Sequence, residues 1–492
     1  MIFPVFANLN GNGYYRVRNV GTQRWASLVD NKATVDKIAG DAELHALQLS
    51  KDTEAILSDP GSIVYITKES GNYQYDLAAQ GTSLESLVDN PVYIRSYGTS
   101  NGEQYYRIYG TYKNTTKFIS DGNLILSQNY GDATLNDMGE VTVKNWNFYP
   151  VDVNSEYYFG TVPTLTVGGT PYCTLFTSFA YKPYSAGVKA YYIGRIGFGM
   201  AEMIEIDGAV PTGSPVIIQC AGDNVADNKL QIENNTPSAL PSNALNGVYF
   251  NYAKNNITNH VAYNPETMRI LGITSDGSLG FITSNISYIP ANTAYLKVPK
   301  GSAPEFKCVS TAEYELNIPD APEQIYMDES NVLQPQDEYS YSGTFNFPAT
   351  KNLSFQFYTS SSLDKESLIG AYSSNNKNVT IDATSNNTYP FQYGSNAAWV
   401  IPSWAGGNLY ITINLQYQYV YFSSIGAVDS LVNENGELKY VDGKLLSNGL
   451  ITVYNLTGQT MVSSSSGLLD TADLPKGIYV AVSNGNSIKL KR

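Results

Sequence analysis

Reactive and metal-binding side chains are scarce in this 492-residue chain. It contains only two histidines, His45 and His260, and three cysteines, Cys173, Cys220 and Cys308. Neither histidine belongs to an HExxH pattern and no cysteine pair is spaced as CxxC, so we expect no zinc site. The odd number of cysteines excludes a complete disulfide framework. We expect three buried thiols, and one bridge is the alternative because exported proteins can form disulfides.

Charged residues are also few, and acidic residues outnumber basic ones. Asp, Glu, Lys and Arg make up 15% of the chain, against about 25% in a typical globular protein, and the net charge is −14. An acidic surface repels phosphate backbones, so a nucleic-acid partner is not expected. The sequence has no apolar run of about 20 residues, so no transmembrane helix is expected either.

The patterns that come closest to catalytic motifs have simpler interpretations. Gly98–Gly102 matches G-x-S-x-G, but a nucleophile elbow needs a helix directly after Ser100. The strand-like Glu103–Tyr109 follows instead, so we interpret the motif as a five-residue hairpin turn. The acidic group Glu202, Glu205 and Asp207 fits the exposed side of a strand better than a catalytic pair.

Other cofactor and metal patterns are missing as well. No glycine-rich phosphate loop ends in Lys-Ser or Lys-Thr, and the acidic turn 433–437 lacks the twelve-residue spacing of a calcium loop. We therefore expect no catalytic residue, no cofactor and no metal, and a chain that is not an enzyme.

Uncharged polar residues and tyrosine are what the chain has in abundance. It contains 40 tyrosines, and 42% of its residues are hydrophobic. Tyrosine favours strands and combines an apolar ring with a hydrogen-bonding tip, which suits half-buried β faces and carbohydrate contact. A chain of this length exceeds one hydrophobic core. We expect an all-β, multidomain protein.

The last residues, 449–492, alternate with the period of two that is typical of strands. Asn484-Gly485 predicts a hairpin that joins Ile478–Val482 to Ile488–Leu490. The pattern VYNLTGQ … LPKGIYVAVSNGNSIKLKR resembles the C-terminal sorting domain of type IX secretion substrates. The resemblance implies export across the outer membrane through the secretion machinery, with residues 425–492 as a sorting-type β-sandwich.

The amino-terminal part predicts one domain over residues 8–153, after a possible leader remnant or short first strand at 1–7. Its ends, GYYRVRNVGTQRWASLVDN and KNWNFYPVD, resemble the start and end of a β-trefoil, a fold that often binds sugars. Between Asp36 and Ser58 the pattern predicts a short helical insertion that carries His45, with Leu44, Leu47 and Ile56 buried.

A second β domain is expected over residues 154–319. It contains an internal echo, in which the turns at 209–215 and 288–292 each feed an apolar strand. The region resembles a β domain that recurs in large surface proteins of type IX secreting bacteria, and this likeness implies no particular chemistry.

Residues 320–424 form the region most informative about function. The layout IYM … YSYSGTFNFPA … SFQFYTS … AAWVIPSWAGGNLYITINL resembles the immunoglobulin-like starch-binding domains of glycan-uptake lipoproteins. In that family aromatic side chains form a platform for sugar rings, which makes Trp399, Trp404 and Tyr393 the candidate ligand-binding residues. A core position is the alternative for Trp399, whereas Trp404, before Gly406-Gly407, is expected to be more exposed.

Tyr417, Tyr419 and Tyr421 share one face of a predicted strand. We interpret them as packing residues rather than as a binding platform.

These patterns favour a secreted or surface-attached protein that binds a ligand and carries out no reaction. The first hypothesis is carbohydrate binding through aromatic side chains, and the second is an adhesin or structural protein that contacts host or neighbouring proteins.

The sorting interpretation predicts where a truncated chain accumulates. Deletion of residues 449–492 should trap the protein in the periplasm of its native bacterium, because the signal for outer-membrane export is removed. Fractionation followed by immunoblotting measures the distribution. Normal export of the truncated chain would contradict the interpretation.

Overall fold

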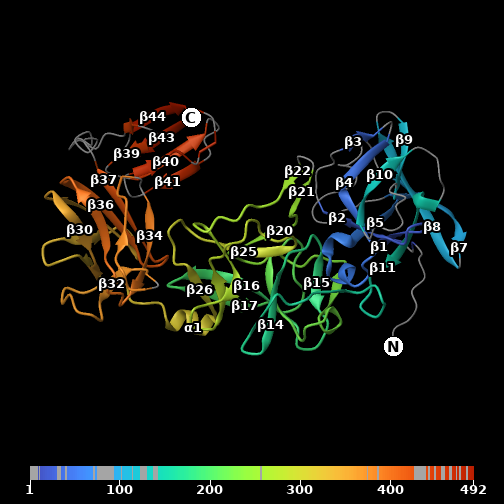
Figure 1. Cartoon of the computed structure of the whole chain (residues 1–492), viewed down its shortest axis with the longest axis horizontal. Helices are drawn as coiled ribbons and strands as arrows, with labels where there is room; N and C mark the ends of the chain where they lie inside the picture. Colours follow the sequence, from blue (N-terminus) through green and yellow to red (C-terminus); the bar gives the residue numbers. More distant parts are fainter. Residues whose placement is uncertain are drawn as a thin grey trace. The chain divides into compact units, whose positions relative to one another are not determined.

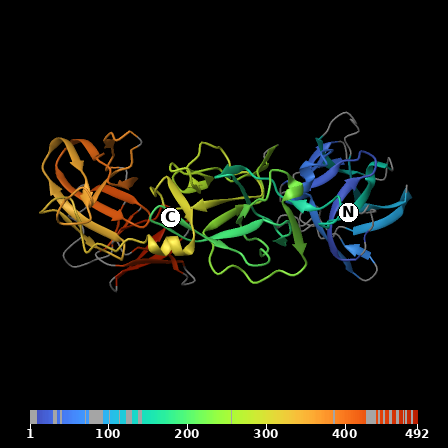
Figure 2. The ribbon, with the colours of Figure 1, turned by 90° about the horizontal axis from the view of Figure 1, so that it is seen from below.

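The computed structural model describes most of the chain. The residues described are 9, 11–29, 35–38, 41–69, 72–74, 93–100, 102–112, 115–121, 130–136, 142–254, 257–373, 375–384, 387–425, 439–441, 444–447, 450–455, 460–464, 468–472, 474–475, 478–483 and 486–491. The chain divides into two units, one with Met1–Val298 and Pro304–Asn317, the other with Pro299–Ala303 and Ile318–Arg492. Strands dominate both units, which confirms the all-β, multidomain prediction (Figures 1 and 2).

The first part of unit 1 is a large antiparallel sheet. Its elements are β1 (Gly13–Asn19), β2 (Trp25–Leu28), β3 (Val35–Ile38), β4 (Asp41–Ser50), η1 (Ala55–Ser58), η2 (Pro60–Ser62), β5 (Ile63–Glu69), β6 (Asn72–Gln74), β7 (Tyr93–Ser100), β8 (Glu103–Tyr112), β9 (Thr115–Ser120), β10 (Tyr130–Asn136), η4 (Thr142–Lys144) and β11 (Asn145–Pro150). The pairings run from β1 through β2, β4, β10, β9, β8 and β11 back to β1, so the sheet closes on itself. The β-trefoil assignment remains a prediction.

The predicted helical insertion between Asp36 and Ser58 is wrong. The structure has the strands β3 and β4 there, followed by the single turn η1. Strand β4 pairs with β2 and β3 on one side and with β10 on the other, and this tertiary pairing overrides a helical sequence pattern. Ile56 is buried as predicted. His45 lies on β4, and the side chains of Leu44, His45 and Leu47 fall outside the described part.

A buried ion pair joins distant segments of this first sheet. Arg24 Nη1 lies 3.2 Å from Asp121 Oδ1, and both side chains are fully buried. Thr22 donates a further hydrogen bond from its hydroxyl to the Asp121 carboxylate. A buried charge is tolerated only with such partners, so the pair fixes how the β1–β2 turn meets the end of β9.

The second part of unit 1 is built around a long mixed sheet. Its elements are β12 (Phe159–Gly160), β13 (Leu165–Val167), β14 (Thr170–Leu175), β15 (Ala180–Pro183), β16 (Lys189–Gly197), β17 (Met200–Glu205), β18 (Val216–Gln219), η5 (Val225–Asp227), β19 (Lys229–Glu233), β20 (Leu245–Val248), β21 (Tyr252–Lys254), β22 (Ile257–Asn259), β23 (Met268–Ile273), β24 (Leu279–Ile282), β25 (Thr293–Lys297), β26 (Glu305–Val309) and α1 (Thr311–Leu316). The long sheet has the order β13-β14-β18-β16-β17-β26-β24-β23-β25-β20.

The two proline-containing turns and the start of helix α1 can be related to the sequence of this part. Strands β18 and β25 follow the two proline-containing turns and belong to one sheet, and the internal repeat itself remains a prediction. Helix α1 begins where the Ser310 hydroxyl accepts a hydrogen bond from the Glu313 N–H at 3.2 Å, as an N-cap should. It lies beside β17 and β26 (Figure 1).

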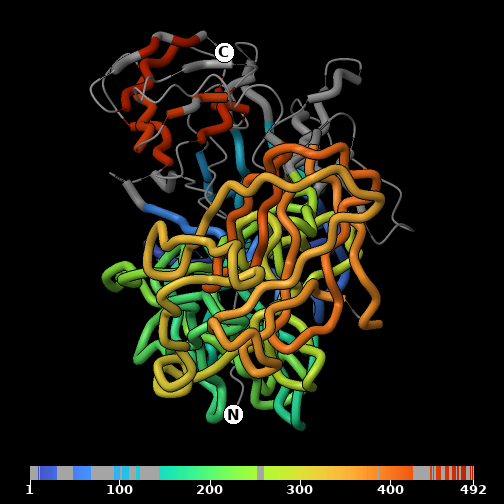
Figure 3. The backbone as a smooth tube through the Cα atoms, turned by 90° about the vertical axis from the view of Figure 1, so that its left-hand side faces the viewer, coloured from blue at the N-terminus to red at the C-terminus, as the bar shows by residue number. Residues whose placement is uncertain are grey.

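Unit 2 contains a closed barrel with the order β27-β28-β29-β36-β37-β34-β32-β31, and a smaller sheet, β30-β35-β33. Its strands are β27 (Ile325–Tyr326), β28 (Val332–Pro335), β29 (Ser340–Phe347), β30 (Thr350–Phe355), β31 (Phe357–Tyr358), β32 (Leu368–Ala371), β33 (Val379–Thr380), β34 (Thr388–Tyr393), β35 (Trp399–Trp404), β36 (Gly407–Asn414) and β37 (Tyr419–Ile425). Figure 3 shows the orange and yellow backbone of this region facing the viewer. The barrel and the smaller sheet share one aromatic core that contains Phe355, Phe357, Trp399 and Phe422. The immunoglobulin-like assignment remains a prediction.

The carboxy-terminal segment is also built from strands. Its elements are β38 (Lys439–Val441), β39 (Lys444–Leu446), β40 (Ile451–Asn455), β41 (Thr460–Ser464), β42 (Leu468–Asp470), β43 (Ile478–Ser483) and β44 (Asn486–Lys491). Strands β43 and β44 pair from Ile478↔Lys491 to Ser483↔Asn486, which confirms the predicted hairpin, although Asn484 and Gly485 themselves lie outside the described residues. Among the described residues, no helix has the length and apolar character needed to cross a bilayer.

Removal of the Asp121 carboxylate tests the buried ion pair. Asp121→Ala should lower the free energy of unfolding by about 3 kcal/mol, because Arg24 is left as an uncompensated buried charge. Urea denaturation measures the loss. In the matched control, Glu205→Ala removes the exposed partner of Lys189 and should cost less than about 1 kcal/mol. Equal losses in the two variants would contradict a structural role for the buried pair.

Candidate functional site

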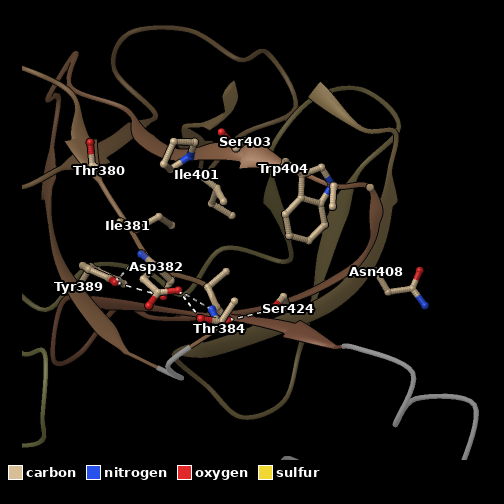
Figure 4. Close-up of a pocket in the computed structure, with 14 residues that line it drawn as sticks. Thr380, Ile381, Asp382, Thr384, Tyr389, Ile401, Ser403, Trp404, Asn408 and Ser424 are labelled. Carbon is tan, nitrogen blue, oxygen red and sulfur yellow. Dashed lines mark hydrogen bonds between the residues drawn. The ribbon is translucent and has the colours of Figure 1, made fainter. Parts of the chain in front are cut away.

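A cavity of about 600 Å³ lies in unit 2 beside strand β35 (Figure 4). Residues from β33 and the loop after it, from β35 and the turn after it, and from the barrel strands β34, β36 and β37 line it. They are Thr380, Ile381, Asp382, Ala383, Thr384, Tyr389, Ile401, Pro402, Ser403, Trp404, Ala405, Gly406, Asn408 and Ser424. The volume lies in the range of about 300–1,000 Å³ that is usual for small-molecule sites.

The apolar part of the wall comes from β35 and from the segment that runs beside it. Ile381 and Ile401 are buried, and the Ile381 N–H donates to the Val400 carbonyl at 2.9 Å. Figure 4 shows both isoleucines between Trp404 on one side of the cavity and Tyr389 on the other. The cavity therefore offers an apolar surface bounded by two aromatic side chains.

A left-handed residue sets the direction of Trp404. In a regular strand alternate side chains share a face, so Trp399 and Ile401 point into the core and position 404 should point away from it. Ser403 has a φ of 53°, which interrupts this alternation, and Trp404 turns inward with only 8% of its surface exposed. Its indole N–H donates to the Phe347 carbonyl at 3.3 Å. Such strain at a non-glycine residue is more frequent at binding sites than elsewhere.

The polar part of the wall is organised around Asp382. Its Oδ1 atom accepts hydrogen bonds from the Thr384 N–H at 2.8 Å and from the Thr384 hydroxyl at 2.6 Å. The Asp382 N–H donates to the Tyr389 hydroxyl at 3.0 Å. These contacts hold the carboxylate and the phenol at the cavity in defined positions. Ser424 ties the same loop to the barrel, because its N–H donates to the Ala383 carbonyl at 2.8 Å.

The three predicted ligand-binding residues do not lie together. Trp399 is 0% exposed and its ring centroid lies 5.5 Å from that of Phe357, which confirms the core alternative and removes it from contact with a ligand. The expected exposure of Trp404 is wrong, although the residue does line the cavity. Tyr393 is 40% exposed but does not line the cavity. It lies at the end of β34 that is next to the start of β37, whereas Ser424 lines the cavity from the far end of β37.

Two tyrosines of β37 pack on the surface of the sheet to which this strand belongs. Tyr419 and Tyr421 alternate along β37 with the buried Val420 and Phe422, and both are half-buried. The ring of Tyr421 lies 6.2 Å from that of Tyr410 on the neighbouring strand. Burial raises the pKa of both Tyr419 and Tyr421. These contacts agree with the prediction of cross-strand packing for Tyr419 and Tyr421. Tyr417 lies in the turn before β37, so its expected place on the same strand face is wrong.

The near-catalytic motifs of the sequence lie in ordinary structural settings. Strands β7 and β8 pair up to Ser100↔Glu103, so the G-x-S-x-G segment is a hairpin as predicted, with a tighter turn than expected. The predicted exposure of Glu202 is wrong: its carboxylate is buried and accepts a 2.7 Å hydrogen bond from Arg195, which lowers its pKa. The described residues contain no cluster of His, Cys, Asp or Glu that could hold a metal ion.

Sequence patterns could not have located Asp382, Tyr389 or Ser403. Asp382 follows a two-residue strand and belongs to no motif, and the left-handed conformation of Ser403 has no signal in a residue type that favours turns only weakly. The one sequence signal nearby is Gly406-Gly407, where both residues have positive φ.

Comparisons with known proteins assign no family to the chain. No family model matches it, and no curated protein matches it. A solved structure described as "Structure and mode of action of a mosquitocidal holotoxin" is similar, with 10% sequence identity and a TM-score of 0.17. The match covers 98% of this chain and 56% of the other, so the chain spans little more than half of that protein's length. A TM-score this low supports no conclusion on fold or function.

Substitution of Trp404 separates its structural role from its place at the cavity. Trp404→Ala should lower the free energy of unfolding by about 3 kcal/mol because it removes a large buried ring. Trp404→Phe should cost less, since it keeps one aromatic ring and loses the bond to Phe347 together with part of the buried indole. Thermal unfolding measures both, with Tyr393→Ala as an exposed aromatic control that should cost less than about 1 kcal/mol. A Trp404→Ala protein as stable as the control would contradict the burial of the indole.

Proposed function

We propose that the chain is a secreted or cell-surface protein that binds carbohydrate without transforming it, and that the cavity beside β35 is its binding site. The observation that supports this proposal most strongly is the pairing of an aromatic and aliphatic wall, Trp404 with Ile381 and Ile401, with the polar Asp382 in one cavity. A sugar ring has the same two-sided character, with apolar C–H faces and hydrogen-bonding hydroxyls around its edge.

Each part of the wall has a role in this proposal. The aromatic ring edge of Trp404 and the isoleucine side chains contact the C–H face of the sugar. The carboxylate of Asp382 and the amide of Asn408 accept or donate hydrogen bonds at the rim. Asn408 already accepts a 2.8 Å bond from Asn346, which orients its amide. Because these groups are fixed by the protein, little conformational entropy is lost when a ligand binds.

The charge of the cavity suggests which sugars it takes. Asp382 is the one ionisable carboxylate among the lining residues, and no lysine or arginine is among them. An acidic sugar would bring a second negative charge beside the Asp382 carboxylate, and the two charges would repel each other. We therefore propose neutral or amino sugars as the ligand class rather than uronic, sialic or sulfated ones.

The proposal also includes export of the chain, with the secretion machinery as the partner of its carboxy-terminal segment. The sorting-like pattern of the last residues supports a location outside the cell. The alternative function, an adhesin or structural protein that contacts proteins, is supported by the tyrosine-rich strand faces alone, so we rank it second.

A saccharide panel tests the proposal directly. The protein is titrated calorimetrically with neutral oligosaccharides, glucosamine oligomers and uronic-acid oligomers, and neutral or amino members should bind. Asp382→Asn should weaken binding at least tenfold, because a charge-assisted hydrogen bond contributes about 1.5–3 kcal/mol.

The matched control is Asp328→Asn. Asp328 is exposed and accepts backbone N–H bonds from Ser330 and Asn331 at 2.8 Å, much as Asp382 does from Thr384, but it does not line the cavity. Its substitution should leave affinity unchanged. Absence of binding to every saccharide, or equal losses in the two variants, would contradict the proposal. Binding to a protein that excess sugar fails to displace would favour the adhesin alternative.

A further inference from the structure

Two of the three cysteines lie on the same face of the sheet in unit 1. Cys173 on β14 is directly opposite Ile218 on β18. The Cys220 N–H donates to the Pro171 carbonyl at 2.8 Å, so the ladder continues one residue past the end of β18. Because alternate residues of a strand point to the same side, Cys220 shares a face with Ile218 and therefore with Cys173.

The two sulfur atoms already approach each other. Cys173 Sγ and Cys220 Sγ lie 4.0 Å apart, and both side chains are buried. The Thr161 hydroxyl lies 3.3 Å from Cys173 Sγ on the same side. Both residues are free thiols in this structure. A disulfide bond has a length of about 2.05 Å, so bond formation needs rotation of both side chains and a shift of the two strands, since the cysteines are diagonal neighbours in the ladder.

We propose that Cys173 and Cys220 form a disulfide bond when the chain folds in an oxidising environment. The bond would link residues 47 apart in sequence and fasten β14 to β18 near the edge of the long sheet. This inference does not depend on the proposed carbohydrate site, which lies in the other unit.

The reaction is a thiol–disulfide exchange with a small-molecule disulfide as the oxidant. The thiolate of one cysteine attacks the oxidant, forms a mixed disulfide and releases the first small thiol. The thiolate of the second cysteine then attacks the protein sulfur of that mixed disulfide and releases the second small thiol. Two protein thiols and one small disulfide thus give one protein disulfide and two small thiols, and both protons leave with the released thiols.

Cys173 Sγ has two hydrogen-bonding partners in the folded sheet. Hydrogen bonding with Cys220 and then with Thr161 lowers the pKa of the Cys173 thiol despite its burial. Burial excludes an oxidant from the folded protein, so the exchange takes place while the sheet forms or when it opens locally.

Cys308 provides an internal comparison. It lies half-buried on β26, so the expectation of three buried thiols is wrong for this residue. Strands β16 and β17 separate β26 from β18 in the same sheet, and desolvation raises the pKa of the Cys308 thiol to about 12. Under the same conditions it should remain a thiol.

Refolding in a redox buffer tests the proposal. The full chain is denatured, reduced and refolded with mixed reduced and oxidised glutathione, then denatured again and alkylated. We expect one alkylated cysteine in place of three, and a non-reducing digest in which the peptides of Cys173 and Cys220 are joined. Cys308→Ser should retain the bridge and lose the remaining label. Cys173→Ser and Cys220→Ser should each lose the bridge.

Stability gives a second measurement that does not rely on the serine variants folding. The oxidised wild-type chain should unfold at a higher urea concentration than the same chain after reduction, because the cross-link restricts the unfolded state. Three alkylated cysteines after oxidative refolding would show that the pair stays a thiol–thiol contact and would overturn the proposal. A bridge that includes Cys308 would also overturn it.

Discussion

Closure of the barrel in unit 2 is the constraint on which the proposed site depends. Strand β36 pairs along its whole length with β29 on one side and β37 on the other, so the positions of Asn408 and Ser424 at one end are fixed by backbone hydrogen bonds. Strand β35 belongs to the smaller sheet, yet Trp399 and Ile401 pack into the same core as the barrel. The cavity forms where this shared core reaches the end of β35. A binding surface placed on strands in this way keeps its shape without a ligand.

An irregular backbone between β35 and β36 places Trp404 in the cavity wall. Three residues with positive φ, Ser403, Gly406 and Gly407, interrupt the extended conformation where β35 leads into β36. The chain keeps its direction there, because β30 and β29 pair with β35 and β36 in the same register. Glycine adopts this conformation at little cost, whereas Ser403 does so at the expense of local strain. The inward rotation of Trp404, with its bond to Phe347, offsets part of that cost by burying an indole ring.

Much of the fold could be predicted from alternation of apolar and polar residues, and the failures have physical causes. The strands at 478–483 and 486–491 follow from a period of two with an Asn-Gly turn. The helix predicted over residues 41–50 is wrong, although the segment DAELHALQLS contains good helix formers. Its conformation is determined by pairing with β10, about ninety residues later in the chain. Local sequence carries no record of such a distant partner. The cavity could not be predicted for a similar reason. Asp382, Tyr389 and Trp404 lie on different segments, and only the folded sheets bring them to one cavity.

In unit 1, two buried side-chain pairs help to specify the native strand registers. Arg24 with Asp121 and Cys173 with Cys220 each connect segments that are far apart in sequence. Pairs of this kind penalise alternative registers, because a shifted strand would leave a charge or a thiol without its partner.

The most direct test of the account is the response of the tryptophan indole N–H signals to saccharide. The chain has four tryptophans, and in the structure Trp404 alone of them lines the cavity, whereas Trp25, Trp146 and Trp399 are fully or almost fully buried in cores. Nitrogen-15 spectra recorded during titration with a neutral oligosaccharide should show a saturable shift of the Trp404 signal, assigned through Trp404→Phe, while the other three stay in place. Saturable binding that leaves the Trp404 signal unmoved would contradict the proposed site.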